Sequence, residues 1–204
     1  MTLDRLRPMV TGAISPSVTL ARRLGLTPNA ISALAVVLAG VAAGVFYVGP
    51  QQGRQWLYVL GSALVVLNGW LDLVDGELAR ALDAGSPAGD LIDHVFDRYA
   101  DLLIIAGLAA GVDQYALGLA AVTGVLMTSY LGTQAQAVGL DRVYGGLVGR
   151  ADRLVLTVVV TLVAGTVTPT VWGLSAVGWL LVFFAVVGHF TALQRFYCSL
   201  QALA

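Results

Sequence analysis

Stretches of about 20 apolar residues recur along the whole chain, and they constrain its fold more than any other feature. A helix of about 20 residues is the length that crosses about 30 Å of hydrocarbon. Of the 204 residues, 58% are hydrophobic and 11% are charged, and the mean hydropathy is +0.84. Such a composition leaves too little polar surface to cover a soluble domain. The sequence therefore predicts an all-α, multi-pass integral membrane protein whose helices share one compact domain.

Turn and cap signals divide the apolar stretches into six predicted transmembrane helices. Thr27-Pro28-Asn29 opens the first, with a capping threonine and a proline in the first turn. The expected spans are about 30–48, 56–81, 89–110, 114–137, 153–168 and 171–197. Residues 1–26 carry several arginines and predict an amphipathic helix on the membrane surface. We thus expect two segments, a surface segment at 1–26 and a six-helix domain at 27–204.

The distribution of arginine predicts the orientation in the cell membrane. Arg54 alone lies at one end of the predicted spans. The opposite end carries Arg5, Arg7, Arg22, Arg23, Arg80, Arg142, Arg150, Arg153 and Arg195. Since basic loops stay in the cytoplasm, both termini and this end are expected to face it. The net charge of −1 and the lack of a basic patch argue against nucleic acid as a partner and leave membrane lipids as the expected surroundings.

Two GxxxG pairs bear on helix packing. Gly40 and Gly44 lie in the first predicted span, and Gly107 and Gly111 end the third. Both pairs would allow close contact between helices. With 24 glycines in the chain, however, chance spacing is the favoured explanation.

Charged residues at membrane depth mark functional sites, and they gather where the second predicted span ends and the third begins. Helical spacing places two sets on one face each: Asp72, Asp75, Gly76, Ala79 and Arg80, then Gly89, Asp93 and Asp97. Four carboxylates this close would be costly to ionise without cations between them. An all-oxygen site suits Mg²⁺, Mn²⁺ or Ca²⁺, and paired ions of this kind recur where phosphoryl oxygens are displaced. The pattern predicts a divalent-metal site for phosphate chemistry.

The small residues of the same face extend this prediction. Gly76 and Ala79 leave a trough beside the carboxylates, and Arg80 adds a fork-shaped cation. A ligand that carries a pyrophosphate would fit there. Intramembrane carboxylates also form ion or proton pathways and structural charge networks, and spacing alone leaves these alternatives open.

The string Asp72-Leu-Val-Asp75-Gly76-Glu-Leu-Ala79-Arg80, followed by Gly89, Asp93 and Asp97, resembles the signature of the CDP-alcohol phosphatidyltransferase family, with every fixed position filled. The resemblance implies phospholipid biosynthesis. In that reaction a phosphatidyl-type group, diacyl or archaeal ether-linked, passes from a CDP-activated lipid donor to the hydroxyl of a small alcohol acceptor, and CMP is released. It also implies a homodimer whose active site opens to the cytoplasm.

The same resemblance implies roles for the motif residues. Two divalent metal ions, Mg²⁺ or Mn²⁺, would be held by Asp72, Asp75, Asp93 and Asp97. Asp97 would also be the general base for the acceptor hydroxyl. The CDP part of the donor would be bound by Asp72, Gly76, Ala79, Arg80 and Gly89.

The acceptor is harder to identify from the sequence. Arg150 and Arg153 resemble the RxxR segment of the family branch that makes phosphatidylinositol phosphate or its archaeal ether-lipid counterpart, although flanking arginines are also common at the ends of spans. That branch carries a basic pair in the fourth span, where this chain has Gly132 and Gln134. Gln134, Arg150 and Arg153 are our candidate acceptor residues. Inositol phosphate, glycerol phosphate, serine and an uncharged polyol stay open.

Two other functions compete with the transferase. An ion or proton transporter would use the same carboxylates as a pathway, but it would need neither an arginine beside them nor fixed glycine spacing. A Mg²⁺-dependent membrane prenyltransferase also pairs aspartate-rich motifs, but those motifs lie far apart in the chain. Here both halves lie between Asp72 and Asp97, which favours the transferase.

Overall fold

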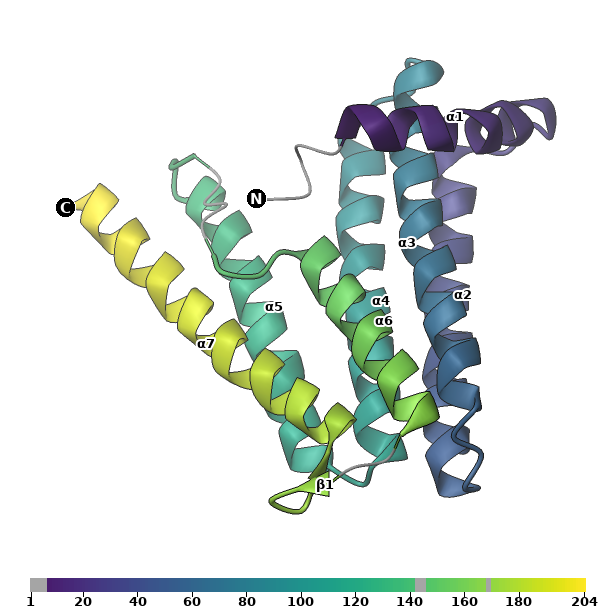
Figure 1. The fold of residues 1–204 in the computed structure, drawn as a ribbon. Helices are drawn as coiled ribbons and strands as arrows, with labels where there is room; N and C mark the ends of the chain where they lie inside the picture. The colour runs from purple at the N-terminus through teal and green to yellow at the C-terminus, as the bar shows by residue number, and fades with distance from the viewer. Residues whose placement is uncertain (1–6, 142–145, 168–169) are drawn as a thin grey trace.

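The computed structural model describes residues 7–141, 146–167 and 170–204, and within these ranges the regular secondary structure is helical apart from one small hairpin (Figure 1). The helices are α1 (Arg7–Arg23), α2 (Pro28–Gln51), α3 (Leu57–Ala81), α4 (Pro87–Gly111), α5 (Tyr115–Ala137), α6 (Arg150–Thr166) and α7 (Ala176–Leu203). The hairpin pairs β1 (Thr170–Val171) with β2 (Leu174–Ser175). The all-α prediction is confirmed.

Four of these helices, α2, α3, α5 and α7, are long and apolar enough to cross a membrane. The helix α4 carries more charge, and α6 has only 17 residues, but both lie among the other four (Figure 1). In the same view α5 and α7 lean away together from the remaining helices, and α1 crosses the ends of α2, α3 and α4. Among the described residues, the structure thus has four candidate membrane spans, where the sequence predicted six.

Short polar side chains start the helices where the sequence indicates. Thr27 accepts a hydrogen bond from the backbone of Ala30 at 3.2 Å, directly before Pro28. Ser86 caps α4 in the same way ahead of Pro87. These caps fix where α2 and α4 begin, and both begin at the same end of the molecule as the motif carboxylates.

The last span begins later than the sequence suggested. We expected a helix from residue 171, but Val171 pairs with Leu174, and α7 begins at Ala176 after the cap Ser175. Between the strands Trp172 and Gly173 have φ angles of 51° and 77°. Two consecutive residues with positive φ form a tight hairpin turn, and that turn replaces the first helical turn we expected.

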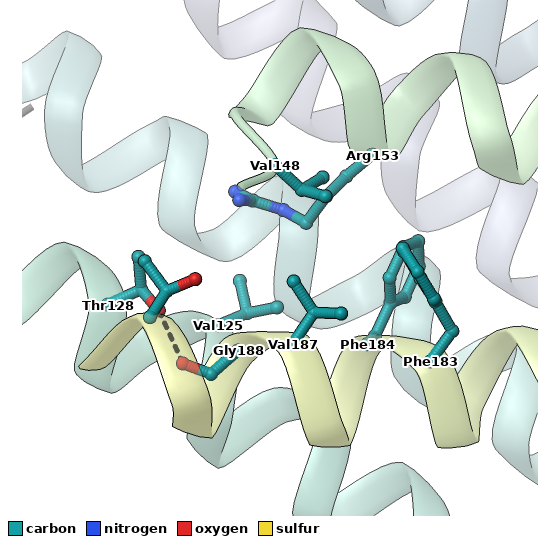
Figure 2. A pocket seen from close by; sticks show the side chains of 9 residues that line it. Val125, Thr128, Val148, Arg153, Phe183, Phe184, Val187 and Gly188 are labelled. Atoms are coloured by element: carbon teal, nitrogen blue, oxygen red, sulfur yellow. Dashed lines mark hydrogen bonds between the residues drawn. The ribbon is translucent and has the colours of Figure 1, made fainter. Parts of the chain in front are cut away.

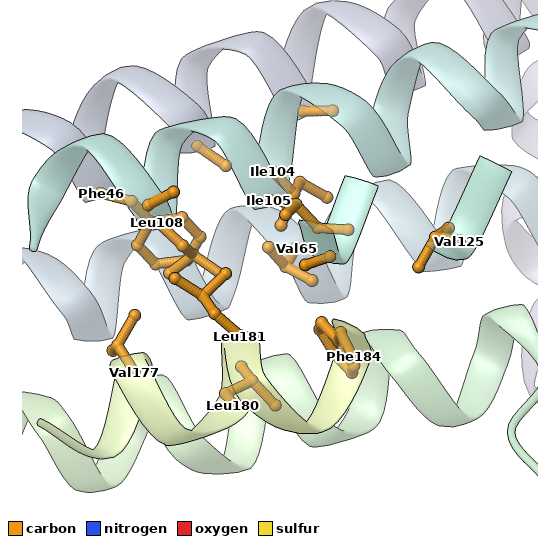
Figure 3. Close-up of a cluster of buried hydrophobic side chains, with 14 of the residues drawn as sticks. Phe46, Val65, Ile104, Ile105, Leu108, Val125, Val177, Leu180, Leu181 and Phe184 are labelled. Atoms are coloured by element: carbon orange, nitrogen blue, oxygen red, sulfur yellow. The ribbon is translucent and has the colours of Figure 1, made fainter. Parts of the chain in front are cut away.

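A central cluster of buried side chains contains residues of every helix from α2 through α7 (Figure 3). Phe46, Leu108, Leu181 and Val65 are fully buried there. A second cluster joins α1 to α2 and α3 through Ile14, Val18, Ala21, Ile31, Val74 and Leu78. The face of α1 that carries Ile14, Val18 and Ala21 is therefore packed against the ends of the neighbouring helices, while Arg22 and Arg23 are exposed.

Glycine lets α4 approach α2 to backbone contact. A Cβ atom on Gly107 would lie 2.5 Å from the Cα and the carbonyl oxygen of Ala43, and one on Gly111 would lie 2.2 Å from the carbonyl oxygen of Phe46. Gly44, in contrast, has open space around it. Chance spacing is thus the wrong explanation for the second GxxxG pair. The contact holds α2 and α4 in a fixed register.

Candidate functional site

Three aspartates from two helices converge at one end of the molecule. Asp72 and Asp75 lie near the end of α3, and Asp93 lies in the second turn of α4. One carboxylate oxygen from each lies within 4.8 Å of the other two. We refer to Asp72, Asp75 and Asp93 as the aspartate triad. Its donors are all oxygen, which is the ligand set that Mg²⁺ and Mn²⁺ prefer.

A serine from a third helix holds one member of the triad. Ser32 of α2 lies 2.5 Å from Oδ2 of Asp75 and donates a hydrogen bond to it. Both side chains are buried, with exposures of 6% and 5%. The hydroxyl therefore fixes the orientation of this carboxylate before any ligand binds.

Asp97 lies next to the triad but is not one of its three members. A single nitrogen, Nη1 of Arg150, lies 2.7 Å from Oδ1 of Asp72 and 2.9 Å from Oδ1 of Asp97. Asp97 follows Asp93 by four residues and so shares its helix face. The four motif aspartates thus lie together, as predicted from spacing, with Arg150 between two of them.

A group of arginines surrounds a fifth aspartate, Asp101. The first turn of α6 begins at Gly149, whose backbone nitrogen donates to Asp152, and it supplies Arg150 and Arg153 three residues apart. The carboxylate of Asp101 lies 2.6 Å from Nη2 of Arg153, 3.6 Å from Nε of Arg150 and 3.6 Å from Nη1 of Arg98. We call Arg98, Arg150 and Arg153 the arginine cluster. It joins α4 to α6 beside the triad.

Arg153 also lines a small pocket between α5, α6 and α7 (Figure 2). Thr128 and Thr191 add polar groups to a lining that is otherwise largely apolar. Among the described residues, neither Nε of Arg153 nor Oγ1 of Thr191 has a hydrogen-bond partner, although both are buried. A fourth arginine, Arg195, donates to the carbonyl oxygen of Thr128 at 2.6 Å. The pocket therefore has polar capacity that the protein itself leaves unused.

The remaining motif residues lie on the outer side of the triad. Arg80 is largely exposed and forms an ion pair with Glu77 on the same helix. A Cβ atom on Gly76 would lie 3.7 Å from Nη1 of Arg80, so the guanidinium lies over the glycine. Ala79 is partly buried on the same helix. This face has the trough and the cation that the spacing predicts.

Gly89 lies where α4 meets the start of α2. A Cβ atom there would lie 3.2 Å from Oγ of Ser86 and 3.9 Å from Oδ1 of Asn29. The close neighbours of Gly89 are therefore side chains, and Asn29 of the Thr27-Pro28-Asn29 helix start reaches the motif. The sequence offered no reason to connect these two segments.

The candidate acceptor residues do not all meet. Arg150 and Arg153 lie together, whereas Gln134 lies partly buried on α5, and no hydrogen bond between described residues joins its side chain to them. Arg5 and Arg142, which we used to predict the orientation, lie outside the described residues.

We did not predict that Ser32 would bind Asp75 or that Arg98 would lie beside Asp97. Asp101 follows Asp97 by four residues on the same helix face, so a spacing signal was present.

Comparison with known proteins connects this geometry to a family. A family model described as CDP-alcohol phosphatidyltransferase matches residues 25–190. The archaetidylinositol phosphate synthase of Methanothermobacter thermautotrophicus is 28% identical over 194 residues, which cover 95% of this chain and 91% of that protein.

Solved structures give the same result. The phosphatidylinositol phosphate synthase of Mycobacterium tuberculosis with CDP-DAG bound is 25% identical, with a TM-score of 0.74 over 91% of this chain and 92% of that one. The same protein in complex with manganese and citrate is 24% identical, with a TM-score of 0.76 over 91% and 88% of the two chains.

Proposed function

The chain belongs to the CDP-alcohol phosphatidyltransferase family, and from that premise we propose its acceptor, its site residues and its placement in the membrane. The protein is a phospholipid-synthesising transferase that moves a phosphatidyl-type group from a CDP-activated lipid to a hydroxyl acceptor and releases CMP. The family depends on divalent metal ions. Membership favours this reaction over the ion transporter and the prenyltransferase that the carboxylates alone left open.

Asp72, Asp75, Asp93 and Asp97 are the residues that would hold two divalent ions, Mg²⁺ or Mn²⁺. The close approach of three carboxylates within 4.8 Å supports this assignment, because such charges repel one another unless a cation lies between them. When bound, the ions polarise the phosphoryl oxygens of the donor. Ser32 contributes by holding Asp75 in one orientation.

The donor's CDP group would lie along Asp72, Gly76, Ala79, Arg80 and Gly89. The small side chains leave room for the pyrophosphate, and the exposed guanidinium of Arg80 presents donors in a planar fork. Glu77 holds this guanidinium beside Gly76. The expected result is a donor whose phosphates face the triad.

Asp97 would be the general base. Its carboxylate is partly buried, and Nη1 of Arg150 holds one of its oxygens at 2.9 Å. It removes the proton from the acceptor hydroxyl, whose oxygen then attacks the β-phosphate of the donor while CMP departs. An ionised carboxylate in hydrogen-bonding reach of that hydroxyl is what general base catalysis requires.

The acceptor that we propose is inositol phosphate. The single observation that carries this choice is the pair Arg150 and Arg153 in the first turn of α6, where two guanidiniums and a helix N-terminus favour a phosphate group. Relatives that are inositol phosphate-using synthases by name support it. Gly132 and Gln134 lack basic groups, but Arg98 and Arg195 bring positive charge to the same end of α5.

We also propose the placement of the chain. All of α2 to α7 would span the membrane, because α4 and α6 lie among the four helices that are long and apolar enough to do so. The helix α1 would lie on the membrane surface, since it crosses the ends of α2, α3 and α4 (Figure 1). By the arginine distribution, this end and both termini would face the cytoplasm. The family resemblance favours a homodimer.

The deciding experiment measures CMP release by the purified protein. The protein is incubated with a CDP-activated lipid, diacyl or ether-linked, with Mg²⁺ or Mn²⁺, and with inositol phosphate, glycerol phosphate, serine or free inositol. We expect the fastest release with inositol phosphate. Faster release with glycerol phosphate, serine or free inositol would refute the proposed acceptor, and no release with any acceptor would refute the transferase.

A further inference from the structure

We propose that Asp101 is a positioning residue whose buried carboxylate orients Arg150 and Arg153 toward the phosphate of the acceptor. This inference rests on the proposed function, because it requires an acceptor that carries a phosphate. Asp101 lies outside the family motif, four residues beyond the proposed base Asp97. Its role is therefore separate from metal binding and from proton transfer.

The geometry connects one carboxylate to both arginines of α6. Oδ2 of Asp101 accepts a hydrogen bond from Nη2 of Arg153 at 2.6 Å, and Oδ1 lies 3.6 Å from Nε of Arg150. The Asp101 side chain is only 4% exposed. One buried carboxylate therefore contacts both side chains, Arg153 through a hydrogen bond and Arg150 at ion-pair distance.

The surroundings explain why this pair holds its position. Asp101 and Arg153 line a small pocket whose other walls include Ile104, Leu154 and Phe184. In such apolar surroundings an unpaired carboxylate or guanidinium is strongly destabilising. Each of the two charges therefore keeps the other in place. Because Arg153 is buried, its guanidinium cannot turn toward solvent instead.

The same contacts leave donors free for a ligand. A guanidinium has five N–H donors, and Nε of Arg153 is buried without a hydrogen-bond partner among the described residues. Arg153 also lines the pocket of Figure 2, where the hydroxyl of Thr191 has no hydrogen-bond partner among the described residues. Asp101 thus uses only part of the hydrogen-bonding capacity of Arg153.

The charge balance indicates a doubly charged phosphate. The arginine cluster has three positive charges, which Asp72, Asp97 and Asp101 balance in this structure. If Asp72 and Asp97 serve as metal ligands, Asp101 alone continues to balance the cluster, and about two positive charges are left over. A phosphate monoester carries about −1.5 to −2 charges at neutral pH. A phosphorylated acceptor fits this excess, and a neutral alcohol does not.

The test is Asp101→Asn, which keeps the shape of the side chain and removes its charge. We expect the KM for inositol phosphate to rise by about 10- to 100-fold, the effect typical of lost outer-shell partners. The KM for the CDP-lipid and the affinity for Mn²⁺, measured by electron paramagnetic resonance, should not change. Calorimetric titration with inositol phosphate should show the same loss of affinity without turnover.

A double-mutant cycle separates positioning from general support of the fold. In an Arg153→Ala background, Asp101→Asn should raise the acceptor KM by less than it does in the wild type, because only the part of its effect that acts through Arg150 is left. Asp90→Asn, an exposed aspartate on the same helix, is the matched control and should leave both KM values unchanged. Equal increases in both KM values, or additive effects in the cycle, would overturn the inference.

Two further outcomes are decisive. If Asp101→Asn does not fold, Asp101→Glu replaces it: its displaced carboxylate should raise the acceptor KM alone, and an unchanged acceptor KM would refute the inference. If the wild-type protein releases CMP only with uncharged acceptors, the proposed acceptor fails and this inference fails with it. If the wild type uses a phosphorylated acceptor and Asp101→Asn matches it, only this inference fails.

Discussion

The aspartate triad and the arginine cluster lie side by side, but the charges of their carboxylates are balanced differently. Within the triad, Asp72 alone pairs with an arginine, Arg150, whereas Asp75 and Asp93 form no ion pair with any arginine that the structure describes. Ser32 is the neighbour that binds Asp75. In the cluster, Asp97 and Asp101 each lie within ion-pair distance of at least two arginines. The triad therefore needs a cation from outside, whereas the cluster brings its own cations and suits an anion.

The comparison shows how one site could bind the two phosphate-bearing substrates that we propose. The helices α3 and α4 supply the negative side, and α4 and α6 supply the positive side, so α4 takes part in both. Asp97 lies at the border, where Arg150 connects it to Asp72. Variants on each side should therefore fail in different ways.

The largest effect is expected at this border. Asp97→Asn removes the proposed base and should lower turnover by about 10²- to 10⁴-fold, the range for loss of general base catalysis. CMP release at saturating acceptor and Mn²⁺ measures it, and size-exclusion chromatography shows whether the variant is folded. CMP release close to that of the wild type would mean that the base lies elsewhere.

A somewhat smaller effect is expected inside the triad. Asp93→Asn should weaken Mn²⁺ binding and reduce activity by about 10²-fold, with part of the loss recovered at high Mn²⁺, because a charged ligand is replaced by a neutral one. Excess EDTA should abolish the activity of the wild type. The control is Asp83→Asn in the exposed loop after α3, which has a φ of 49° that asparagine tolerates. Equal losses in both variants would contradict a site specific to the triad.

On the positive side, Arg153→Ala should affect the acceptor rather than the metal. We expect the KM for inositol phosphate to rise by about 10- to 100-fold, in line with a lost charge-assisted contact of about 1.5–3 kcal/mol. The KM for the CDP-lipid should stay constant. The exposed Arg23→Ala is the control. A rise in the KM for the CDP-lipid instead would mean that the arginine cluster binds the donor and not the acceptor.

The smallest effect is expected at Ser32. Ser32→Ala removes the hydrogen bond to Asp75 and should reduce Mn²⁺ affinity by about tenfold, the lower range for an outer-shell partner. Ser62→Ala is a matched control, since its buried hydroxyl bonds Thr161 far from the site. Mn²⁺ titration followed by electron paramagnetic resonance compares the two, and equal affinity in both would remove Ser32 from the site.

Much of the fold was predictable because bilayer thickness and capping residues act locally. Thr27 and Pro28 mark the start of α2, and hydropathy places the middle of each predicted span. The start of α7 was missed because Trp172 adopts a positive φ angle, which side-chain hydropathy does not report. The backbone contact of Gly107 with Ala43 was missed for a related reason, since a GxxxG pair does not indicate which helix it packs against.

The candidate site was predictable only where its residues share a helix. Spacing brings Asp72 beside Asp75 and Asp93 beside Asp97, and no tertiary knowledge is needed for that. The contact of Ser32 with Asp75 spans 43 residues, and that of Asp101 with Arg153 spans 52, so both depend on how the helices pack. Arg150 was identified by resemblance, but its position between two aspartates was not.

The 52 residues between Asp101 and Arg153 also impose an order on biogenesis. Each charge at the centre of a membrane helix costs about 2.5–3.5 kcal/mol on insertion, so an α4 that spans the bilayer, as we propose, is poorly suited to enter it alone. At the usual speed of translation, Arg153 emerges on the order of several seconds after Asp101. We therefore expect α4 to remain with the translocon, or against α2 and α3, until α6 arrives and neutralises it.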